Sequence, residues 1–453
     1  MPFPRFSRRC LRHCTSVVLT AIGVFVVYFL TRIHWTHQDR FGIADWRKGT
    51  IESALHNNNT TDCASLQGMN DILVILKTGA TEALGKVPVH LETTFRCVKH
   101  FVIFSDHEED IFDVRTQDIL RGVGEQTRQT NPDFEIYNRL RAFGREGLIE
   151  DDWNDDENGP LGKPGNPGWK LDKWKFVPMI DEALLVKPEA HWYIFIEADT
   201  YIIWRNMIRW LSQLDRKKPY YLGAPMQMGK EVFAYGGAGI VLSNAAMQLI
   251  SRYRAENFAA VEQMTADDWA GDHVLGKIID HIGVPLVWSW PLLSASSVWE
   301  FEHFNELYGH KAWCFPAVSY HHMSPQDIQD MWLFEQQWFR YKKDSVLLHK
   351  DIFKWHVYDL TSSKRDDWDN LSSDQQPHSN NSDSLMNFER CGNICSLTTD
   401  CLQFSFSDRG CLISKKVIGG VPRPGIHSGW MGMRVKALMQ TAGNCARIQY
   451  ITR

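Results

Sequence analysis

The sequence predicts an α/β protein whose strands form a largely parallel sheet. Short apolar runs such as residues 72–76 and 101–104 are typical of buried strands, and segments such as 171–186 space their apolar residues as a helix does. Because such strands and helices alternate, a sheet with helices on both faces is expected. Two further observations complete the prediction: an uncharged segment near the N-terminus, and four cysteines within residues 391–411.

Composition fits a globular protein and excludes several other classes. The 453 residues include 49 Lys+Arg and 54 Asp+Glu, giving a net charge of −5, with 44% hydrophobic and 23% charged residues. A mildly acidic chain lacks the basic footprint of a nucleic-acid binder, and the composition is neither collagen-like nor that of a disordered protein. The length allows two or three domains.

The N-terminus predicts a membrane anchor. Residues 14–31 carry no full charge, which just reaches the length of a membrane-spanning helix, and four arginines but no acidic residue precede them. By the positive-inside rule, residues 1–13 are a cytoplasmic tail, 14–33 a signal anchor, and 34–67 the start of a luminal part, a polar stem. A cleaved signal peptide is the rival interpretation, but no small-x-small cleavage site follows.

Cysteines and glycosylation sequons agree with a luminal location. Eight cysteines follow the anchor, and an even number in an oxidising compartment predicts disulfides, although the sequence leaves three pairings open for the four between 391 and 411. Asn-x-Ser/Thr sequons stand in polar stretches, where an acceptor should be accessible. The sequons are at Asn58, Asn59, Asn370 and Asn380.

The order of elements follows from the apolar pattern. After the stem, a domain at 68–345 is expected, then a polar linker at 346–384 and a disulfide-rich module at 385–437. An acidic, Gly/Pro-rich loop is predicted at 150–168. The predicted strands lie at 72–76, 101–104, 191–196 and 220–223, and the predicted helices at 171–186, 204–214, 244–253 and 272–282.

An acidic pair ends the most apolar predicted strand. Glu197 and Asp199 flank Ala198 directly after residues 191–196, and residues i and i+2 of extended backbone project to the same side. Carboxylates at the mouth of a sheet require a cation or hydrogen bonds, and hard oxygen ligands suit Mg²⁺ or Mn²⁺. A pair that only caps the strand end is the alternative.

Three later motifs add candidate groups. Gly236, Gly237 and Gly239 precede an apolar run and permit close backbone approach to a ligand, or simply a tight turn. Asp272 begins a predicted helix, either as an N-cap or as a general base. His321 follows a short strand and is a candidate metal ligand, although a lone histidine is usually not one.

Taken in order, these motifs resemble glycosyltransferase family 31, nearest to its Fringe and core 1 β1,3-galactosyltransferase branch. Residues 101–106 and 169–176 match further segments of that branch, and the resemblance covers about residues 68–345. It implies a GT-A domain, a Rossmann-like fold that binds a UDP-sugar. It also implies Mn²⁺, or Mg²⁺, held by Asp199 and His321, with Asp272 as the catalytic base.

The resemblance also implies further substrate-binding residues: Asp106, Trp169, Lys173, Glu197, Gly236, Gly237 and Gly239. The expected protein is a type II Golgi membrane enzyme that transfers a hexose, galactose favoured, from a UDP-sugar to a glycan or glycoprotein in β1,3 linkage with inversion. A homodimer is a further option. Two departures stand out, since the family often has Asp-Asp-Asp at 197–199 and an acidic residue at 271, where this chain has glycine.

The C-terminal cysteine pattern resembles a PAN/Apple domain, which implies binding of proteins or carbohydrates; a stabilising appendage without a ligand is equally compatible. A catalytically inactive, membrane-tethered carbohydrate-binding or adaptor protein is therefore the alternative function. The tryptophans at 169, 174, 288, 290 and 299 are candidates for stacking on acceptor sugar rings, with core packing as the commoner role.

Overall fold

A computed structural model describes residues 66–153, 163, 165–375 and 386–452. The predicted tail and anchor, nearly all of the predicted stem, and the sequons at Asn58, Asn59 and Asn380 lie outside the described residues. Among the helices that the structure describes, none is both long and apolar enough to cross a bilayer.

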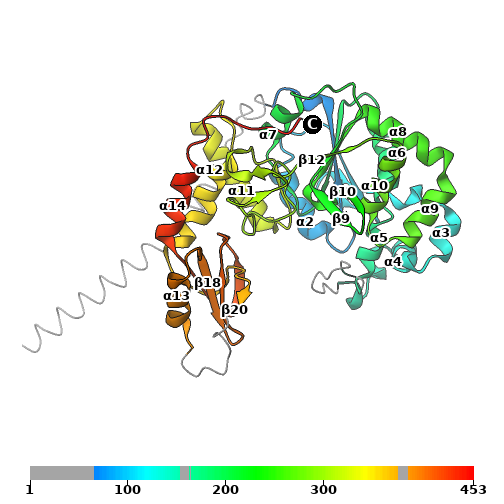
Figure 1. The fold of residues 1–453 in the computed structure, drawn as a ribbon. Coiled ribbons are helices and arrows are strands. Elements are labelled where there is room, and N and C mark those ends of the chain that lie inside the picture. The colour runs from blue at the N-terminus through cyan, green and yellow to red at the C-terminus, as the bar shows by residue number, and fades with distance from the viewer. Residues whose placement is uncertain (1–65, 154–162, 164, 376–385, 453) are drawn as a thin grey trace, which may run out of the picture. The chain divides into compact units, whose positions relative to one another are not determined.

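A seven-stranded sheet forms the centre of residues 66–345, here called the sheet domain, and confirms the predicted α/β class (Figure 1). β11 is antiparallel to both of its neighbours, and the other neighbouring strands run parallel. In spatial order the strands are β12 (Leu286–Trp288), β8 (Tyr221–Gly223), β11 (Ile240–Ser243), β6 (Trp192–Glu197), β1 (Ile72–Lys77), β2 (Phe101–Ser105) and β5 (Gln117–Asp118).

Both faces of this sheet are buried, which explains why its central strands are continuous apolar runs. In β1, Leu73 and Ile75 face one hydrophobic cluster, and Ile72, Val74 and Leu76 face another. Figure 1 shows the two helical layers on opposite sides of the sheet. The first layer contains α6 (Phe176–Val186), α8 (Asn244–Glu256) and α10 (Gly271–His281); the second contains α2 (Ala83–Glu92) and α7 (Trp204–Leu211).

The predicted helix at 171–186 is two helices in the structure. α5 (Pro167–Asp172) ends before α6 begins, and residues 173–175 form a turn in which Trp174 N donates to Leu171 O. The turn directs the ammonium of Lys175, whose side chain is 2% exposed, onto Asp106 at 2.9 Å. Apolar spacing continues through this turn, so the pattern alone did not reveal the break.

Further helices and short strands surround the sheet. α11 (Pro325–Tyr341) begins at a capping box, because Ser324 accepts from Asp327 N while Asp327 accepts from Ser324 N. The others are α3 (Glu125–Thr130), α4 (Glu135–Phe143), α9 (Phe258–Asp267), α12 (His349–Ile352), β3 (Asp110–Ile111), β4 (Val114–Arg115), β7 (Tyr201–Ile202), β9 (Pro225–Met228), β10 (Glu231–Ala234), β13 (Glu306–Leu307), β14 (His310–Lys311) and β15 (Ser319–Tyr320).

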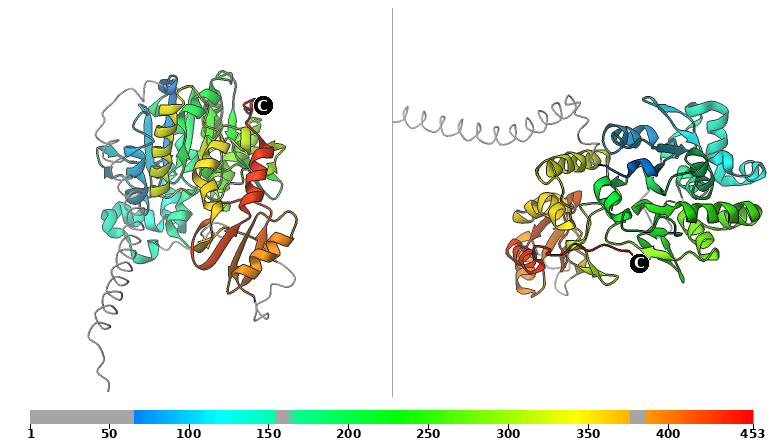
Figure 2. Two further views of the ribbon diagram at one scale, coloured as in Figure 1. Left: turned by 90° about the vertical axis from the view of Figure 1, so that its left-hand side faces the viewer. Right: turned by 90° about the horizontal axis from the view of Figure 1, so that it is seen from above.

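A five-stranded antiparallel sheet with one helix follows, here called the C-terminal module (residues 365–430). Figure 2 shows α13 (Phe388–Leu397) beside this sheet. The predicted linker contains two of the strands. In spatial order they are β16 (Arg365–Asp369), β20 (Val421–Trp430), β18 (Gln403–Ser407), β19 (Gly410–Ser414) and β17 (Asp374–Gln375).

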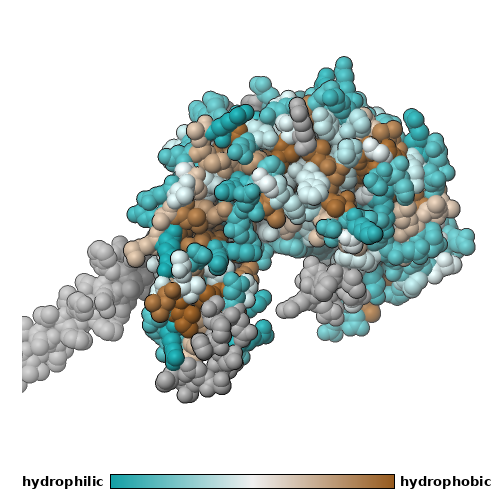
Figure 3. Space-filling model, viewed as in Figure 1, coloured by the Kyte–Doolittle hydropathy of each residue, from teal (hydrophilic) through white to brown (hydrophobic). Residues whose placement is uncertain are grey.

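Disulfides confirm the prediction from the cysteine count. Of the three pairings that the sequence allowed in the module, the structure forms Cys391–Cys411 and Cys395–Cys401. The module and the sheet domain belong to one compact unit that begins at Ser65. On the face drawn in Figure 3, hydrophilic residues cover most of the surface, and hydrophobic residues gather on part of the module.

The last described residues return to the sheet domain. α14 (Gly432–Ala442) leads to Cys445, which is bonded to Cys314. Beyond it, Ile451 O accepts a hydrogen bond of 2.6 Å from Nε1 of Trp210 on α7. The chain therefore leaves the sheet domain, builds the module, and is fastened to the sheet domain again.

The expectation that Asn370 is an accessible glycan acceptor is wrong. Asn370 is 0% exposed, and its Nδ2 donates to Phe404 O at 3.0 Å and to Gly429 O at 3.2 Å. Its Oδ1 accepts from Ser372 Oγ, the hydroxyl of the sequon itself. The side chain is therefore a buried link between strands.

Candidate active site

The candidate residues gather at the carboxyl edge of the central sheet. β1 and β6 pair in parallel with Lys77 opposite Glu197, so both strands end at the same edge. Lys77 Nζ lies 3.0 Å from Glu197 Oε1 and also bonds Asp172. Asp199 follows two residues later, and Asp106 follows the end of β2. Parallel strands in α/β proteins place their ligand sites at this edge.

A short ladder brings a distant histidine to the acidic pair. β15 pairs with β7, with Tyr320 opposite Tyr201, so that His321 arrives beside Asp199. Nε2 of His321 lies 3.1 Å from Asp199 Oδ1 and 3.5 Å from Glu197 Oε2. This contact joins residues 122 positions apart, and the sequence could reveal it only through the family resemblance.

His322 was missed as a ligand by the sequence analysis. Asp199, His321 and His322 each offer one ligand atom, and these atoms lie within 4.8 Å of one another. His322 has φ of 54°, which is uncommon for a residue with a Cβ. The adjacency of two histidines after a strand was the available signal. The structure therefore assembles three candidate ligands where two were expected.

Neighbouring cationic groups neutralise the acidic pair at this edge. Burial alone would lower the pKa of His321, but contacts with Asp199 and Glu197 raise it to about 9. Burial would raise the pKa of Asp199, but His321 and Lys86 hold it well below its usual range; Lys86 Nζ lies 3.2 Å from Asp199 Oδ2. The carboxylate is therefore ionised at neutral pH, and His321 would release its proton on binding a metal.

The donor set fits a divalent metal such as Mn²⁺. His321 is 2% exposed, and neither of its ring nitrogens makes a hydrogen bond of normal geometry with the described residues. A buried nitrogen without such a partner is costly unless a ligand occupies it. Carboxylate oxygen together with imidazole nitrogen suits first-row divalent ions. Glu197 pairs with Lys77 through its other oxygen, so the candidate metal ligands are Asp199, His321 and His322.

The glycine segment is a turn that packs against the metal-site histidine. Gly236–Ala238 forms one 3₁₀ turn before β11. A Cβ on Gly237 would lie 2.1 Å from Cε1 of His321, and Gly239 has φ of +95°. Only glycine satisfies both positions.

Asp272 lies on the other side of the same turn. Its Oδ2 accepts a 2.8 Å hydrogen bond from Gly236 N, and its Oδ1 accepts from His273 N. It is the second residue of α10, whose N-cap is Ala270, so Asp272 is not the N-cap. Burial raises its pKa to about 6, and a pKa near the working pH suits a general base.

The glycine at 271 has a steric reason. A Cβ there would lie 2.4 Å from Cδ2 of Phe176 and 2.6 Å from the carbonyl oxygen of Lys173. The acidic side chain that the family resemblance led us to expect at this position therefore has no space here. Lys77 lies 4.3 Å from the ring centroid of Phe176, so the aromatic ring occupies this part of the edge.

The remaining predicted residues are held within the protein. Asp106 is 3% exposed and accepts from Ala80 N at 2.7 Å while facing Lys175. Lys173 Nζ donates to Asp268 O at 2.9 Å and pairs with Asp133 at 2.9 Å. Trp169 stacks on Trp269, with ring centroids 5.8 Å apart. These residues flank the edge and are not brought into the Asp199 cluster.

The tryptophans separate by burial. Trp174 and Trp290 are 2% and 9% exposed and belong to hydrophobic clusters, whereas Trp288, at the end of β12, is 45% exposed and contacts Tyr308 with ring centroids 5.2 Å apart. Trp288 is therefore the most exposed of the five candidates, and Trp169 and Trp299 are partly buried.

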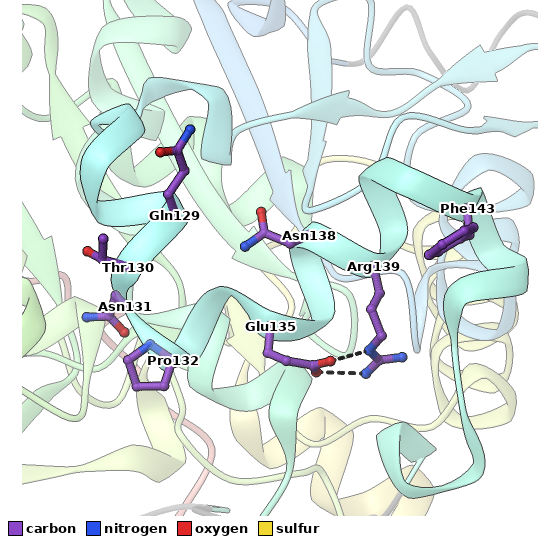
Figure 4. A pocket seen from close by; sticks show the side chains of 8 residues that line it. All are labelled: Gln129, Thr130, Asn131, Pro132, Glu135, Asn138, Arg139 and Phe143. Carbon is purple, nitrogen blue, oxygen red and sulfur yellow. Dashed lines mark hydrogen bonds and ion pairs between the residues drawn. The ribbon is translucent and has the colours of Figure 1, made fainter.

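Two cavities differ in whether they include residues of the candidate site. One of about 440 Å³ lies along α3 and α4 and is lined by residues 129–132, 135, 138, 139 and 143, including the Glu135–Arg139 ion pair (Figure 4). None of the residues named above for the metal or base site lines it, so it is no part of the candidate site. A second, of about 530 Å³, includes His322 in its lining.

Comparison with known proteins agrees with the resemblance seen in the sequence. A family model described as Fringe-like matches residues 67–344, which include every candidate residue above. No curated protein matches the chain. The module at 365–430 lies outside the matched range, so its likeness to PAN/Apple domains stays a prediction.

Proposed function

This chain belongs to the Fringe-like family of glycosyltransferases, and from that premise we propose a metal-dependent, inverting hexosyltransferase. Its donor is a UDP-sugar, with galactose favoured, and its acceptor is a glycan or glycoprotein that receives the sugar in β1,3 linkage. The observation that carries the proposal is that His321 and Asp272 lie on either side of one glycine turn. The turn places Gly237 against His321 and offers Gly236 N to Asp272.

Asp272 and the metal site supply complementary chemistry, and Asp272 acts on the acceptor. Asp272 takes the proton of the acceptor hydroxyl as the hydroxyl oxygen attacks the anomeric carbon of the donor. The bond between that carbon and the diphosphate oxygen breaks, and its electron pair leaves with UDP. Attack from the face opposite the leaving group converts an α-linked donor into a β-glycoside.

Asp199, His321 and His322 would hold the metal ion. When bound, a divalent cation neutralises negative charge on the departing diphosphate. Lys86 and Lys77 pair with Asp199 and Glu197 and hold these two carboxylates in position. The site thus combines a leaving-group side and a base side, as single displacement requires.

The cellular setting is part of the proposal and is supported by the sequence alone. The uncharged segment at 14–33, the preceding arginines and the disulfides fit a type II Golgi membrane protein with a luminal catalytic part.

The direct test is a donor screen with the full-length chain. UDP release from a panel of UDP-sugars is measured with Mn²⁺ or with EDTA. Release from one donor that EDTA abolishes supports the proposal and names the sugar. Absence of release from every donor, together with no thermal shift by Mn²⁺ and UDP, contradicts it and favours a carbohydrate-binding or adaptor protein.

Asp199→Ala sharpens the metal assignment. At a UDP concentration 100 times the dissociation constant, bound ligand stabilises a protein by about 2.7 kcal/mol. The Mn²⁺-dependent part of this increment should disappear in Asp199→Ala, as read by thermal unfolding. Glu82→Ala is the matched control, because it removes another carboxylate that pairs with Lys86 and spares the metal ligands. An unchanged increment in Asp199→Ala removes Asp199 from the site.

A further inference from the structure

The C-terminal module closes one side of the cavity that contains His322. The sheet domain contributes residues of the loop after β12 and of the start of α11, and the module contributes Trp368 and residues 420–422. The cavity volume is about 530 Å³, within the range of small-molecule sites. One candidate metal ligand therefore lines a cavity shared by both parts of the protein.

The lining chemistry selects a neutral, hydroxyl-rich ligand. Two indole rings, Trp299 and Trp368, meet the acids Glu300 and Asp327 in this cavity, and its lining contains no lysine or arginine. Anionic groups such as phosphates are disfavoured by the acids. Pyranose rings combine apolar C–H faces with hydroxyl donors, which match indole faces and carboxylate acceptors.

The two acidic side chains in the cavity lining differ in how many hydrogen bonds they already accept from the protein. Asp327 is occupied, because it accepts from Nε1 of Trp299 at 2.8 Å and from Ser324. Glu300 accepts from Ser297 Oγ through Oε2 at 3.0 Å, and its Oε1 has no hydrogen-bond partner among the residues that the structure describes. Glu300 thus offers a fixed acceptor that faces the cavity with one oxygen unused.

The module side of the cavity is fixed in place. Gly420 N donates to Trp299 O at 2.9 Å, which joins the two parts at the cavity wall. Trp368 Nε1 donates to Gly419 O at 2.8 Å, and Lys416 pairs with Glu302 of the sheet domain. The Cys314–Cys445 bond adds a covalent connection between the sheet domain and the segment that follows the module. These contacts hold the module side of the cavity in position before a ligand binds.

We propose that this cavity is a carbohydrate-binding subsite for the glycan acceptor, completed by the C-terminal module. That the bound glycan is the acceptor rests on the proposed function. The proposal adds that the module forms part of the substrate site. His322 belongs both to this cavity and to the candidate metal cluster, so a sugar bound there would lie beside the metal site.

The test uses a substitution that fills the cavity. Val421 lines it from the module, and Val421→Trp adds bulk without removing a hydrogen bond. Leu397→Trp is the matched control, because Leu397 is 86% exposed on α13 and does not line the cavity. Glu300→Gln is a second variant that keeps the size of the side chain and the contact with Ser297. Each full-length variant is applied, with Mn²⁺ and UDP, to a printed array of mono- and oligosaccharides.

Val421→Trp is expected to weaken binding to the glycans that the unmodified protein recognises by at least tenfold, with Leu397→Trp unchanged. Glu300→Gln should weaken binding more modestly. The thermal shift by Mn²⁺ and UDP should persist in all variants. Equal glycan binding by Val421→Trp and Leu397→Trp overturns the proposal, as does the absence of any glycan binding by the unmodified protein.

Transfer assays distinguish this failure from failure of the proposed function. With UDP-galactose and benzyl N-acetyl-α-galactosaminide, transfer with an unchanged acceptor KM in Val421→Trp leaves the enzyme proposal standing and refutes the subsite. Glycan binding lost in Val421→Trp, in a protein that releases UDP from no donor, supports the subsite and refutes the enzyme.

Discussion

The carboxyl edge of the central sheet and the interior of the C-terminal module both bury polar side chains, but they treat them differently. At the edge the buried groups are charged or titratable, and His321 keeps ring nitrogens without normal hydrogen bonds. In the module the buried polar groups are neutral with one exception, Asp369, which pairs with Arg423. Asn370 and Gln403 are both 0% exposed, and each bonds backbone atoms of neighbouring segments.

The difference separates function from scaffold. Burying a charge costs free energy unless a partner or a ligand compensates, so a cluster such as Asp199 and His321 indicates a site that binds something. Neutral amides whose oxygen and nitrogen are both hydrogen-bonded indicate a unique, rigid packing. Substitutions at the edge should therefore change chemistry, and those in the interior of the module should change stability.

Asp272→Asn gives the largest expected effect. The amide keeps the shape of the side chain but cannot accept the acceptor proton, so transfer should fall by about 10²–10⁴-fold. The thermal shift by Mn²⁺ and UDP should stay as in the unmodified protein, because no metal ligand changes. Retained turnover would remove Asp272 from the base role.

Removing the Cys391–Cys411 bond tests the C-terminal module, the other region of the comparison. A double Cys391→Ser/Cys411→Ser variant opens a loop with a sequence separation of 20 residues. A closed loop of similar length contributes about 3 kcal/mol to stability. Chemical denaturation should show this loss, while the Mn²⁺ and UDP increment persists. Loss of that increment would mean that the metal site depends on the module.

Asn370→Ala should lower the free energy of unfolding by somewhat less than loss of the disulfide. The change leaves two carbonyl groups and the Ser372 hydroxyl without their buried partner, at a cost of about 2 kcal/mol. Asn393→Ala, at an exposed position of α13, serves as control and should be near neutral. Mass spectrometry should find no glycan on Asn370; an occupied site would contradict the buried position.

The pH profile gives the smallest effect. Since the pKa of Asp272 is raised to about 6, the carboxylate is ionised and active as a base above that pH and protonated below it. The rate should therefore be near its plateau at pH 7.5 and fall by about tenfold per pH unit below 6. A profile that stays flat down to pH 5 would show that Asp272 is not the titrating base.

The sequence predicted the parts that follow a local pattern. The strands β1, β2 and β6 are apolar runs buried on both faces, and Asp199 and Asp272 follow or begin elements whose type was evident. His322 and Lys86 were missed because their contacts depend on tertiary structure: a two-residue ladder brings His322 near, and α2 brings Lys86.

Polarity misled the prediction at the linker. Residues 365–375 contain many acidic and serine residues, which are typical of exposed loops, yet β16 and β17 pair within the module's sheet. The structure stabilises them through cross-strand hydrogen bonds and buried amides rather than through an apolar face. No periodicity in the sequence signals such a strand.

The return of the chain to the sheet domain has a practical consequence for protein engineering. The module behaves as an insertion with both ends fastened, because Cys445 bonds Cys314 and Ile451 O accepts from Trp210. A truncation placed after residue 437, where the resemblance to a PAN/Apple domain ends, would leave Cys314 as an unpaired thiol and the Trp210 indole N–H without its acceptor. Shortened versions of the protein should therefore retain the final residues or remove Cys314 as well.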